Sequence, residues 1–538
     1  MLLAGALLAA CASSPEGDAS QGEAAGPEQP VEIPDVVEEP SPEDESEPDV
    51  EAPPPEPEHE PEPEEIPASR DALQGQLQRV IEAAVGELDG GRLGVLVVDE
   101  HGREVHGHAP DEPLMPASTQ KLVTAAGLLR TLGPEARLRT VVEAGAPLEE
   151  NGALRGDLHL RGGGDPTLAT DDYGRWVYPA RPRTPLDDLA DDLVDAGLVR
   201  VRGDVIVDAE GFVGPKRAEG WRDTYFSDLD ARLIGGLTVD GGLETLMSFP
   251  DGPELDTPEH DDPDDGRERF RPRPRPHPDE REDLGTPRVR VQAAPDPAVQ
   301  AGVELIRLLE ERGVRVDGGA VAGPPDTAPV GRLAQVESPP MRVLLRFMVQ
   351  QSDNHLADTL WHVLGRVRTG EGSWAGGDRA ARQVLELLGV DHEHARLADG
   401  SGLSRDDRLT ARLLVDLDRA MTDGRHAEVW RALMAIAGEE GTLRTRLRGT
   451  QAQGRLLGKT GTLSDVAALS GVVEGDGDAR YHFAVLANDA QGADRAVVRA
   501  LVDEVGLLLT ADLIDCRATR DGDADDTPLG QPPVLVRC

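Results

Sequence analysis

Lysine is scarce in this chain. Of its 55 lysine and arginine residues, only Lys121, Lys216 and Lys459 are lysine. A guanidinium stays charged in proteins, so the abundant arginine cannot serve where chemistry needs an amine that can lose its proton. The retained lysines are therefore candidates for chemistry. Lys121 and Lys459 lie in short motifs, whereas Lys216 is interpreted as an exposed loop residue.

Positive charge is also scarce relative to negative charge. The formal net charge is −46, and residues 12–69 contain twenty acidic residues without a lysine or arginine. A surface this acidic repels phosphate backbones, which argues against nucleic acid as a partner. The same stretch holds fourteen prolines. Its low hydrophobicity and self-repelling charge predict an extended, disordered tether.

The apolar run within residues 1–11 has the length of a signal-peptide h-region and is too short to span a bilayer. It ends in Leu-Ala-Ala-Cys, which resembles a bacterial lipobox and predicts lipidation of Cys11. The alternative is a plain signal peptide with an incidental cysteine. Cysteine occurs only twice more, at Cys516 and Cys538. In an exported protein these two either form a disulfide or remain free thiols in a loose tail.

Hydrophobic periodicity predicts an α+β body around an antiparallel sheet, split by a long middle region. Near the start a helical pattern precedes a buried strand, and near the end three consecutive strand candidates precede a closing helix. The middle region mixes short strands with two helices. The expected parts are a signal peptide (1–11), a tether (12–69), the first part of the body (70–137), an inserted region (138–330) with a disordered insertion at about 251–287, the second part of the body (331–510), and a tail (511–538).

Ser118 and Lys121 are three residues apart, so on a helix they share one face. A serine hydroxyl is a poor nucleophile until an adjacent base removes its proton. Lys121 can be that base if desolvation and a second cation lower its pKa, and Lys459 is the natural second cation. By itself the spacing is weak, because Ser118 could equally be a helix N-cap.

Residues 352–354 read Ser-Asp-Asn at the expected start of another helix. One interpretation is an ordinary N-cap. In the functional interpretation, Ser352 relays a proton between Lys121 and the leaving amine. Asn354 then hydrogen-bonds the substrate amide and Lys121.

Residues 459–462 read Lys-Thr-Gly-Thr at the end of a predicted strand. Lys459 and Thr460 are suited to binding a terminal carboxylate. Gly461 lets a substrate backbone lie beside the strand edge. The N–H of Thr462 can pair with that of Ser118 as an oxyanion hole.

In this order, S-x-x-K, S-D-N and K-T-G form the active-site signature of serine penicillin-recognising enzymes. Further similarity lies at residues 160–168, 203–208 and 399–405. Over about 71–510 the chain resembles the D-alanyl-D-alanine carboxypeptidase/endopeptidase family, the low-molecular-mass class C penicillin-binding proteins. The resemblance implies a β-lactamase/transpeptidase-like body with smaller β-rich domains inserted between the first two motifs. Asp407 departs from it, because the family more often has Asn there.

The resemblance also implies substrates and further site residues. Asp165 and Arg405 are candidates for gripping the charged side chain of a diaminopimelate residue; their alternative roles are a turn residue and a surface charge. Peptidoglycan stem peptides would be the substrates and β-lactams covalent inhibitors. The acyl-serine reaction needs no cofactor or metal. The protein would be exported to the periplasm and held to a membrane by its lipid alone.

Two other functions stay open. The nearest is another serine acyl-enzyme hydrolase, such as an esterase or a β-lactamase. The second is a catalytically silent wall-binding lipoprotein whose tether is the functional part. Retention of lysine at Lys121 and Lys459, in a chain that otherwise avoids lysine, argues against a silent site.

Overall fold

A computed structural model describes residues 68–514, except 89, 210, 249–258, 262–267, 273–285, 327 and 491–492. The chain divides into residues 1–64 and 65–538, and everything described lies in the second unit. The expected tether, Cys11 with its lipobox, Cys516 and Cys538 lie outside the described residues. No helix in the described part has the length and apolar character needed to span a membrane.

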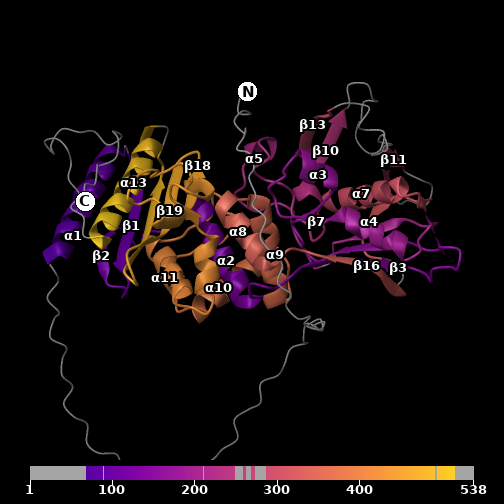
Figure 1. Ribbon diagram of the computed structural model, residues 1–538, viewed down its shortest axis with the longest axis horizontal. Helices are drawn as coiled ribbons and strands as arrows, with labels where there is room; N and C mark the ends of the chain where they lie inside the picture. The colour runs from indigo at the N-terminus through magenta and orange to yellow at the C-terminus, as the bar shows by residue number, and fades with distance from the viewer. Residues whose placement is uncertain are drawn as a thin grey trace, which may run out of the picture. The chain divides into compact units, whose positions relative to one another are not determined.

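A six-stranded antiparallel sheet forms the centre of the body (Figure 1). Seven of the eight residues of its strand β1 are buried, as expected for an apolar run covered on both faces. Strand β1 pairs with β20 over its whole length, so the two ends of the body meet in one sheet. In spatial order the strands are β17 (Ala435–Ile436), β18 (Leu456–Leu463), β19 (Val466–Glu474), β20 (Arg480–Asn488), β1 (Arg92–Asp99) and β2 (Glu104–His108).

Helices cover both faces of this sheet (Figure 1). The first and last helices, α1 (Ala68–Glu87) and α13 (Ala493–Leu513), pack together on one face. The other face carries the remaining helices of the body and the larger apolar core. These helices are α2 (Gln120–Thr131), α8 (Met341–Gln351), α9 (Asn354–Thr369), α10 (Trp374–Leu387), α11 (Ala411–Thr422) and α12 (Ala427–Leu433). Two 3-10 turns, η1 (Ala117–Thr119) before α2 and η3 (Gly441–Leu443) after β17, complete the body. The arrangement confirms the predicted α+β class.

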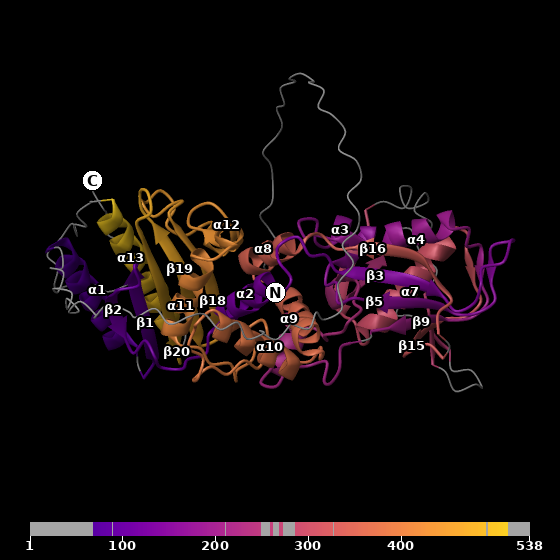
Figure 2. The ribbon, with the colours of Figure 1, turned by 90° about the horizontal axis from the view of Figure 1, so that it is seen from below.

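The region between α2 and α8 contains its own seven-stranded mixed sheet (Figure 2). Its strands, in spatial order, are β11 (Glu259–Asp261), β12 (Arg269–Arg271), β15 (Ala320–Ala322), β9 (Val205–Asp208), β5 (Leu158–Gly162), β3 (Arg139–Ala144) and β16 (Gly331–Glu337). Helices α4 (Leu186–Asp195) and α7 (Pro297–Glu311) pack on it around a separate apolar core. Strands β11 and β12 lie inside the stretch expected to be a disordered insertion, and they pair with each other.

Shorter elements complete this inserted region. Two small parallel sheets and one antiparallel pair, β10 with β13, accompany the larger sheet. The elements are β4 (Ala153–Leu154), β6 (Leu168–Ala169), α3 (Asp171–Trp176), β7 (Thr184–Pro185), β8 (Arg200–Val201), α5 (Asp223–Ser227), η2 (Asp240–Gly242), β10 (Leu243–Ser248), β13 (Arg288–Ala293) and β14 (Arg315–Val316).

A buried cluster of polar side chains joins α11 and α12 to the sheet. A substitution in this cluster tests its contribution to stability. Asp418 on α11 accepts hydrogen bonds from Trp430 Nε1 and from His482 Nδ1, each at 2.7 Å. Replacing Asp418 by Ala leaves two buried donors without a partner, each at a cost of about 1–3 kcal/mol. We expect Asp418→Ala to lower the free energy of unfolding by about 2–5 kcal/mol in denaturant titrations.

Asp416→Ala is the matched control on the same helix, because its side chain is one-third exposed. It should change the free energy of unfolding by less than about 0.5 kcal/mol. Equal effects of the two substitutions would contradict the assigned role of the buried cluster.

Candidate active site

The structure brings Ser118 and Lys121 together at the start of α2. Lys121 Nζ lies 2.9 Å from Ser118 Oγ, and its side chain has no exposed surface. Ser118 does not open the α-helix as expected. It sits in the 3-10 turn η1, and α2 begins at Gln120. Ala117 in this turn has φ 46°, a strained value for a residue with a side chain, which is typical of a position that the surroundings hold in place.

Two further acceptors surround the amine of Lys121. Its Nζ donates to Asn354 Oδ1 at 2.7 Å and to the backbone carbonyl of Ser401 at 2.7 Å. The Ser118 hydroxyl, the Asn354 amide and the Ser401 carbonyl come from three distant parts of the chain. The amine is therefore fixed beside the serine oxygen with three partners, the largest number that an ammonium can satisfy.

The second motif occupies the junction between α8 and α9. Ser352 ends α8 in the left-handed region, with φ 60° and ψ 36°. Asp353 is the N-cap of α9, and its Oδ1 accepts from the N–H of Leu356 at 2.9 Å. The N-cap interpretation of the motif is therefore correct for Asp353. At the same time the junction directs Asn354 at Lys121, as the functional interpretation requires.

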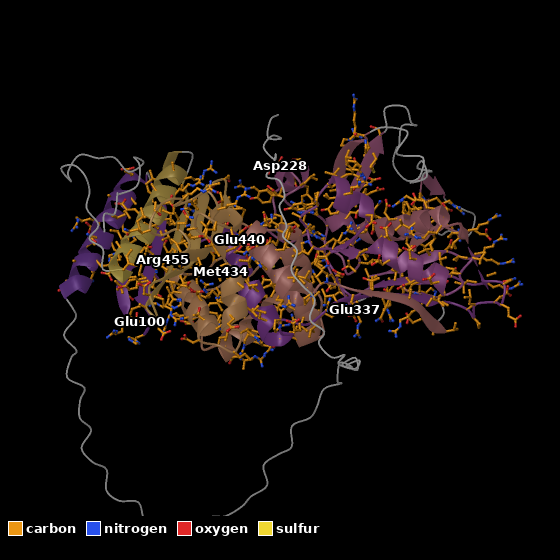
Figure 3. All side chains as sticks on the ribbon, in the orientation of Figure 1. Glu100, Asp228, Glu337, Met434, Glu440 and Arg455 are labelled. Atoms are coloured by element: carbon orange, nitrogen blue, oxygen red, sulfur yellow. The ribbon has the colours of Figure 1, made fainter. Side chains whose placement is uncertain are left out.

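Helix α8 is fastened to the edge of the sheet, close to this junction. Gln350 Nε2 donates to the carbonyl of Met434 at 3.1 Å, and Arg346 Nη2 contacts Glu440 Oε1 at 2.6 Å. Figure 3 labels Met434 and Glu440 on the ribbon beside α8. These contacts hold the end of α8 next to β17, which pairs with β18 at Leu457 and Gly458, directly before the third motif.

The third motif lies within β18, which continues past it to Leu463. Lys459 Nζ donates to Ser352 Oγ at 2.9 Å and to the carbonyl of Thr460 at 2.7 Å. Thr460 Oγ1 donates to Thr442 Oγ1 at 2.8 Å. A Cβ at Gly461 would lie 2.6 Å from the carbonyl oxygen of Pro116, so glycine allows β18 to approach the turn that holds Ser118. Thr462 is exposed at this end of the strand.

Burial changes the acid–base behaviour of both lysines. It lowers the pKa of Lys121 to about 8, although nearby carboxylates, chiefly those of Asp358 and Asp399, oppose the change. Burial, followed by repulsion from Lys121, lowers the pKa of Lys459 well below its ordinary value. The sequence predicts that desolvation and the charge of Lys459 both lower the pKa of Lys121. In the structure desolvation does so, and the mutual repulsion of the pair acts on Lys459.

A buried loop after α10 supplies the carboxylate of Asp399 and the Ser401 carbonyl, whereas Asp358 lies on α9. Asp399 Oδ1 accepts from the N–H groups of Ser401 and Gly402, and its Oδ2 accepts from Trp221 Nε1 and the N–H of Ser404. This folds the backbone around one carboxylate and turns the Ser401 carbonyl toward Lys121. Residues 399–405 resemble a run of the family, but that resemblance implies no role for Ser401.

Asp165 lies in a buried turn of the inserted region, where internal partners surround its carboxylate. Oδ1 accepts from the N–H of Thr167 at 2.8 Å and from its hydroxyl at 2.6 Å, while Oδ2 accepts from Thr184 Oγ1 at 2.6 Å. Asp165 as a whole is only 3% exposed. These contacts favour the role of a turn residue.

The guanidinium of Arg405 also has a partner within the protein. Its guanidinium makes two contacts with the carboxylate of Asp465, in the turn between β18 and β19, one of them 2.5 Å from Nη2 to Oδ2. The pair lies near the end of the third motif.

Lys216, by contrast, forms a surface ion pair with Asp296 at 2.9 Å, as expected of an exposed loop residue. No group of three or more His, Cys, Asp or Glu residues within the described part of the chain is arranged to hold a metal ion.

Comparison with known proteins agrees with this geometry. The chain is 31% identical over 466 residues to the D-alanyl-D-alanine carboxypeptidase of Actinomadura sp. (strain R39), covering 79% of this chain and 84% of that protein. It is 29% identical over 437 residues to carboxypeptidase DacB of Mycolicibacterium smegmatis, covering 79% and 82%.

Among solved structures, penicillin binding protein 4 (dacB) from Haemophilus influenzae matches with a TM-score of 0.62 at 20% identity. That match covers 77% of this chain and 94% of that structure, and it establishes the shared fold. The sequence also matches the D-Ala-D-Ala carboxypeptidase 3 (S13) family over residues 73–256 and 284–507. The resemblance deduced from the three motifs is confirmed, and the chain belongs to the D-Ala-D-Ala carboxypeptidase 3 (S13) family.

Proposed function

We propose that this protein is a serine-type D-alanyl-D-alanine carboxypeptidase that hydrolyses the terminal D-Ala-D-Ala bond of peptidoglycan stem peptides. The observation that carries the proposal is the buried amine of Lys121, 2.9 Å from Ser118 Oγ. A neutral amine at this position is the base that a serine nucleophile requires. Membership of the S13 family supports the same reaction.

In the acylation step, Ser118 Oγ attacks the carbonyl carbon of the penultimate D-alanine while Lys121 Nζ takes the hydroxyl proton. The C–N bond then breaks, and D-alanine leaves after its nitrogen receives a proton through Ser352. That proton is the one that Lys121 took from Ser118, so its transfer restores the neutral amine of Lys121. Lys459 Nζ lies 2.9 Å from Ser352 Oγ and holds the relay hydroxyl in place. The N–H groups of Ser118 and Thr462 would stabilise the oxyanion.

Substrate binding is assigned to the edge of β18. Lys459 and Thr460 would hold the terminal carboxylate of the stem peptide, and Gly461 leaves the strand edge open to the substrate backbone. Water then attacks the acyl-serine ester and releases the shortened peptide with Ser118 regenerated. Penicillins would acylate the same oxygen. The same site could also cut D-Ala–diaminopimelate crosslinks, because the acyl donor is identical in both reactions.

Arg405 and Asp165 remain proposals for the grip on a diaminopimelate side chain. To act, Arg405 must exchange its internal partner Asp465 for a substrate anion, or bind the anion with its remaining donors. Asp165 would have to give up its contacts with threonine. The export signal, the periplasmic location, the lipid anchor at Cys11 and a Cys516–Cys538 disulfide are likewise proposals that rest on the sequence.

Labelling with a fluorescent penicillin tests the acyl-serine assignment. We expect purified residues 70–538 to form a stable covalent adduct, and Ser118→Ala to form none because the attacking oxygen is absent. Gel fluorescence measures the adduct, and release of D-alanine from a D-Ala-D-Ala peptide measures turnover. Absence of an adduct with the wild type would contradict the assignment, whereas rapid release of hydrolysed penicillin would favour a β-lactamase.

The requirement for an amine that can lose its proton is tested by Lys121→Arg. A guanidinium keeps the positive charge but cannot act as a base, so the acylation rate constant should fall about 10²–10⁴-fold. Lys216→Arg is the control, since Lys216 lies in a surface ion pair. Its acylation rate should equal that of the wild type. Substantial acylation by Lys121→Arg would show that another group is the base.

The pH dependence of acylation follows from the pKa of Lys121, which burial lowers to about 8. Only the neutral amine accepts the serine proton, and its fraction falls about tenfold for each pH unit below the pKa. The second-order acylation rate constant should therefore rise about tenfold per unit toward pH 8 and then level off, as stopped-flow measurements would show. A flat profile between pH 6 and 9 would contradict a lysine base.

A further inference from the structure

Two residues of the inserted region contact the second motif directly. Arg181 Nη1 lies 2.6 Å from Asp353 Oδ2, and the backbone carbonyl of Asp230 accepts from Asn354 Nδ2 at 3.0 Å. Ser352 is the proton relay and Asn354 Oδ1 accepts from Lys121 Nζ, so both contacts bear on residues of the site. They come from a part of the chain with its own sheet and core.

Arg181 forms a buried ion pair rather than a surface contact. Its side chain is 3% exposed and that of Asp353 is 5% exposed. Arg181 Nη2 also donates to the carbonyl of Pro166 at 3.2 Å, so the guanidinium is anchored within the inserted region. Separating a buried pair leaves an uncompensated charge, which is strongly unfavourable. Asp353 therefore cannot move away from Arg181 without a large loss of stability.

The two oxygens of Asp353 serve different parts of the chain. Oδ1 caps α9 through the N–H of Leu356, and Oδ2 meets Arg181. Ser352 and Asn354 are the residues on either side of this carboxylate. Fixing Asp353 at both oxygens thereby restrains the left-handed backbone of Ser352, φ 60°, which an L-residue does not favour by itself.

The Asp230 carbonyl sets the orientation of the Asn354 amide. A carbonyl oxygen only accepts, so it must face the NH₂ group of Asn354. The amide oxygen Oδ1 is then the atom directed at Lys121 Nζ, 2.7 Å away. The reverse orientation would place the NH₂ donors against the lysine amine and the oxygen against another oxygen. The inserted region thus decides which end of the amide the catalytic amine meets.

We propose that the inserted region is a working part of the active site, in which Arg181 is a positioning residue that holds Ser352 and Asn354 in place for acylation. The Asp230 carbonyl completes this arrangement by orienting Asn354. The inference rests on the proposed acyl-serine function and extends it to a part of the chain outside the three motifs.

The test compares Arg181→Met and Arg181→Lys with the wild type. Time courses of fluorescent penicillin labelling at several concentrations separate the non-covalent dissociation constant from the acylation rate constant. We expect Arg181→Met to lower the rate constant about 10–100-fold, since a misplacement of about 1 Å has effects of this size. The dissociation constant should change less than about threefold. Arg181→Lys, which keeps a cation near Asp353, should recover part of the rate.

Arg307→Met is the matched control. Arg307 is also a buried arginine of the inserted region, with its side chain 6% exposed, and it pairs with Glu304 and Glu311 within α7. Its removal should lower the melting temperature to a similar extent as Arg181→Met but leave the acylation rate constant at the wild-type value. Equal acylation rate constants for Arg181→Met, Arg307→Met and the wild type would overturn the inference.

Asp353→Asn keeps the test decisive if Arg181→Met does not fold. Asparagine is as good an N-cap as aspartate, so α9 retains its cap while the ion pair is lost. The acylation rate constant should again fall, and a wild-type rate constant would overturn the inference. Absence of labelling in the wild type would overturn the proposed function along with it. A labelled wild type with unaffected variants overturns the positioning role alone.

Discussion

The burial of two lysine amines in one small site is the constraint on which the rest of the structure depends. An ammonium removed from water is tolerated only when hydrogen-bond acceptors replace its solvation. Lys121 finds them on Ser118, Asn354 and Ser401, and Lys459 finds them on Ser352 and Thr460. The loss of solvation favours the neutral form of the amine beside the serine. The fold must therefore bring together segments more than 230 residues apart.

The sheet is what makes that assembly possible. Pairing of β1 with β20 closes the body across its first and last parts, and Asn488 at the end of β20 adds two hydrogen bonds to the backbone of Met115. These bonds hold the segment that leads into the turn of Ser118. Gly461 then allows β18 to lie against the same turn. The nucleophile is thus fixed by backbone contacts from both sides, which explains how Ala117 can retain its strained conformation.

The sequence allowed the three motifs and the α+β class to be predicted, because each depends on residue types that the chemistry or the periodicity restricts. Lysine stood out since arginine cannot replace it as a base. No comparable signal marks Arg181, which is one arginine in a chain full of them and lies 172 positions from Asp353. The Ser401 carbonyl was also beyond prediction, because every residue has one and only the folded loop turns it toward Lys121. The family resemblance made Asp165 a candidate for substrate binding. The threonine donors that surround its carboxylate are evident only in the folded structure.

Asp407 stands where the family more often has Asn, and this departure is compatible with the chemistry of the site. Burial, followed by the charge of Asp399, raises the pKa of the Asp407 carboxyl well above its ordinary value. Its Oδ1 accepts from the N–H of Ala398 at 2.6 Å. A protonated carboxyl offers one accepting oxygen and one donor, as the side-chain amide of asparagine does. The buried position therefore disfavours a second negative charge beside Asp399. Through Oδ1, Asp407 still accepts from the backbone of Ala398 and Asp399, and so it supports the loop whose Ser401 carbonyl holds the catalytic amine.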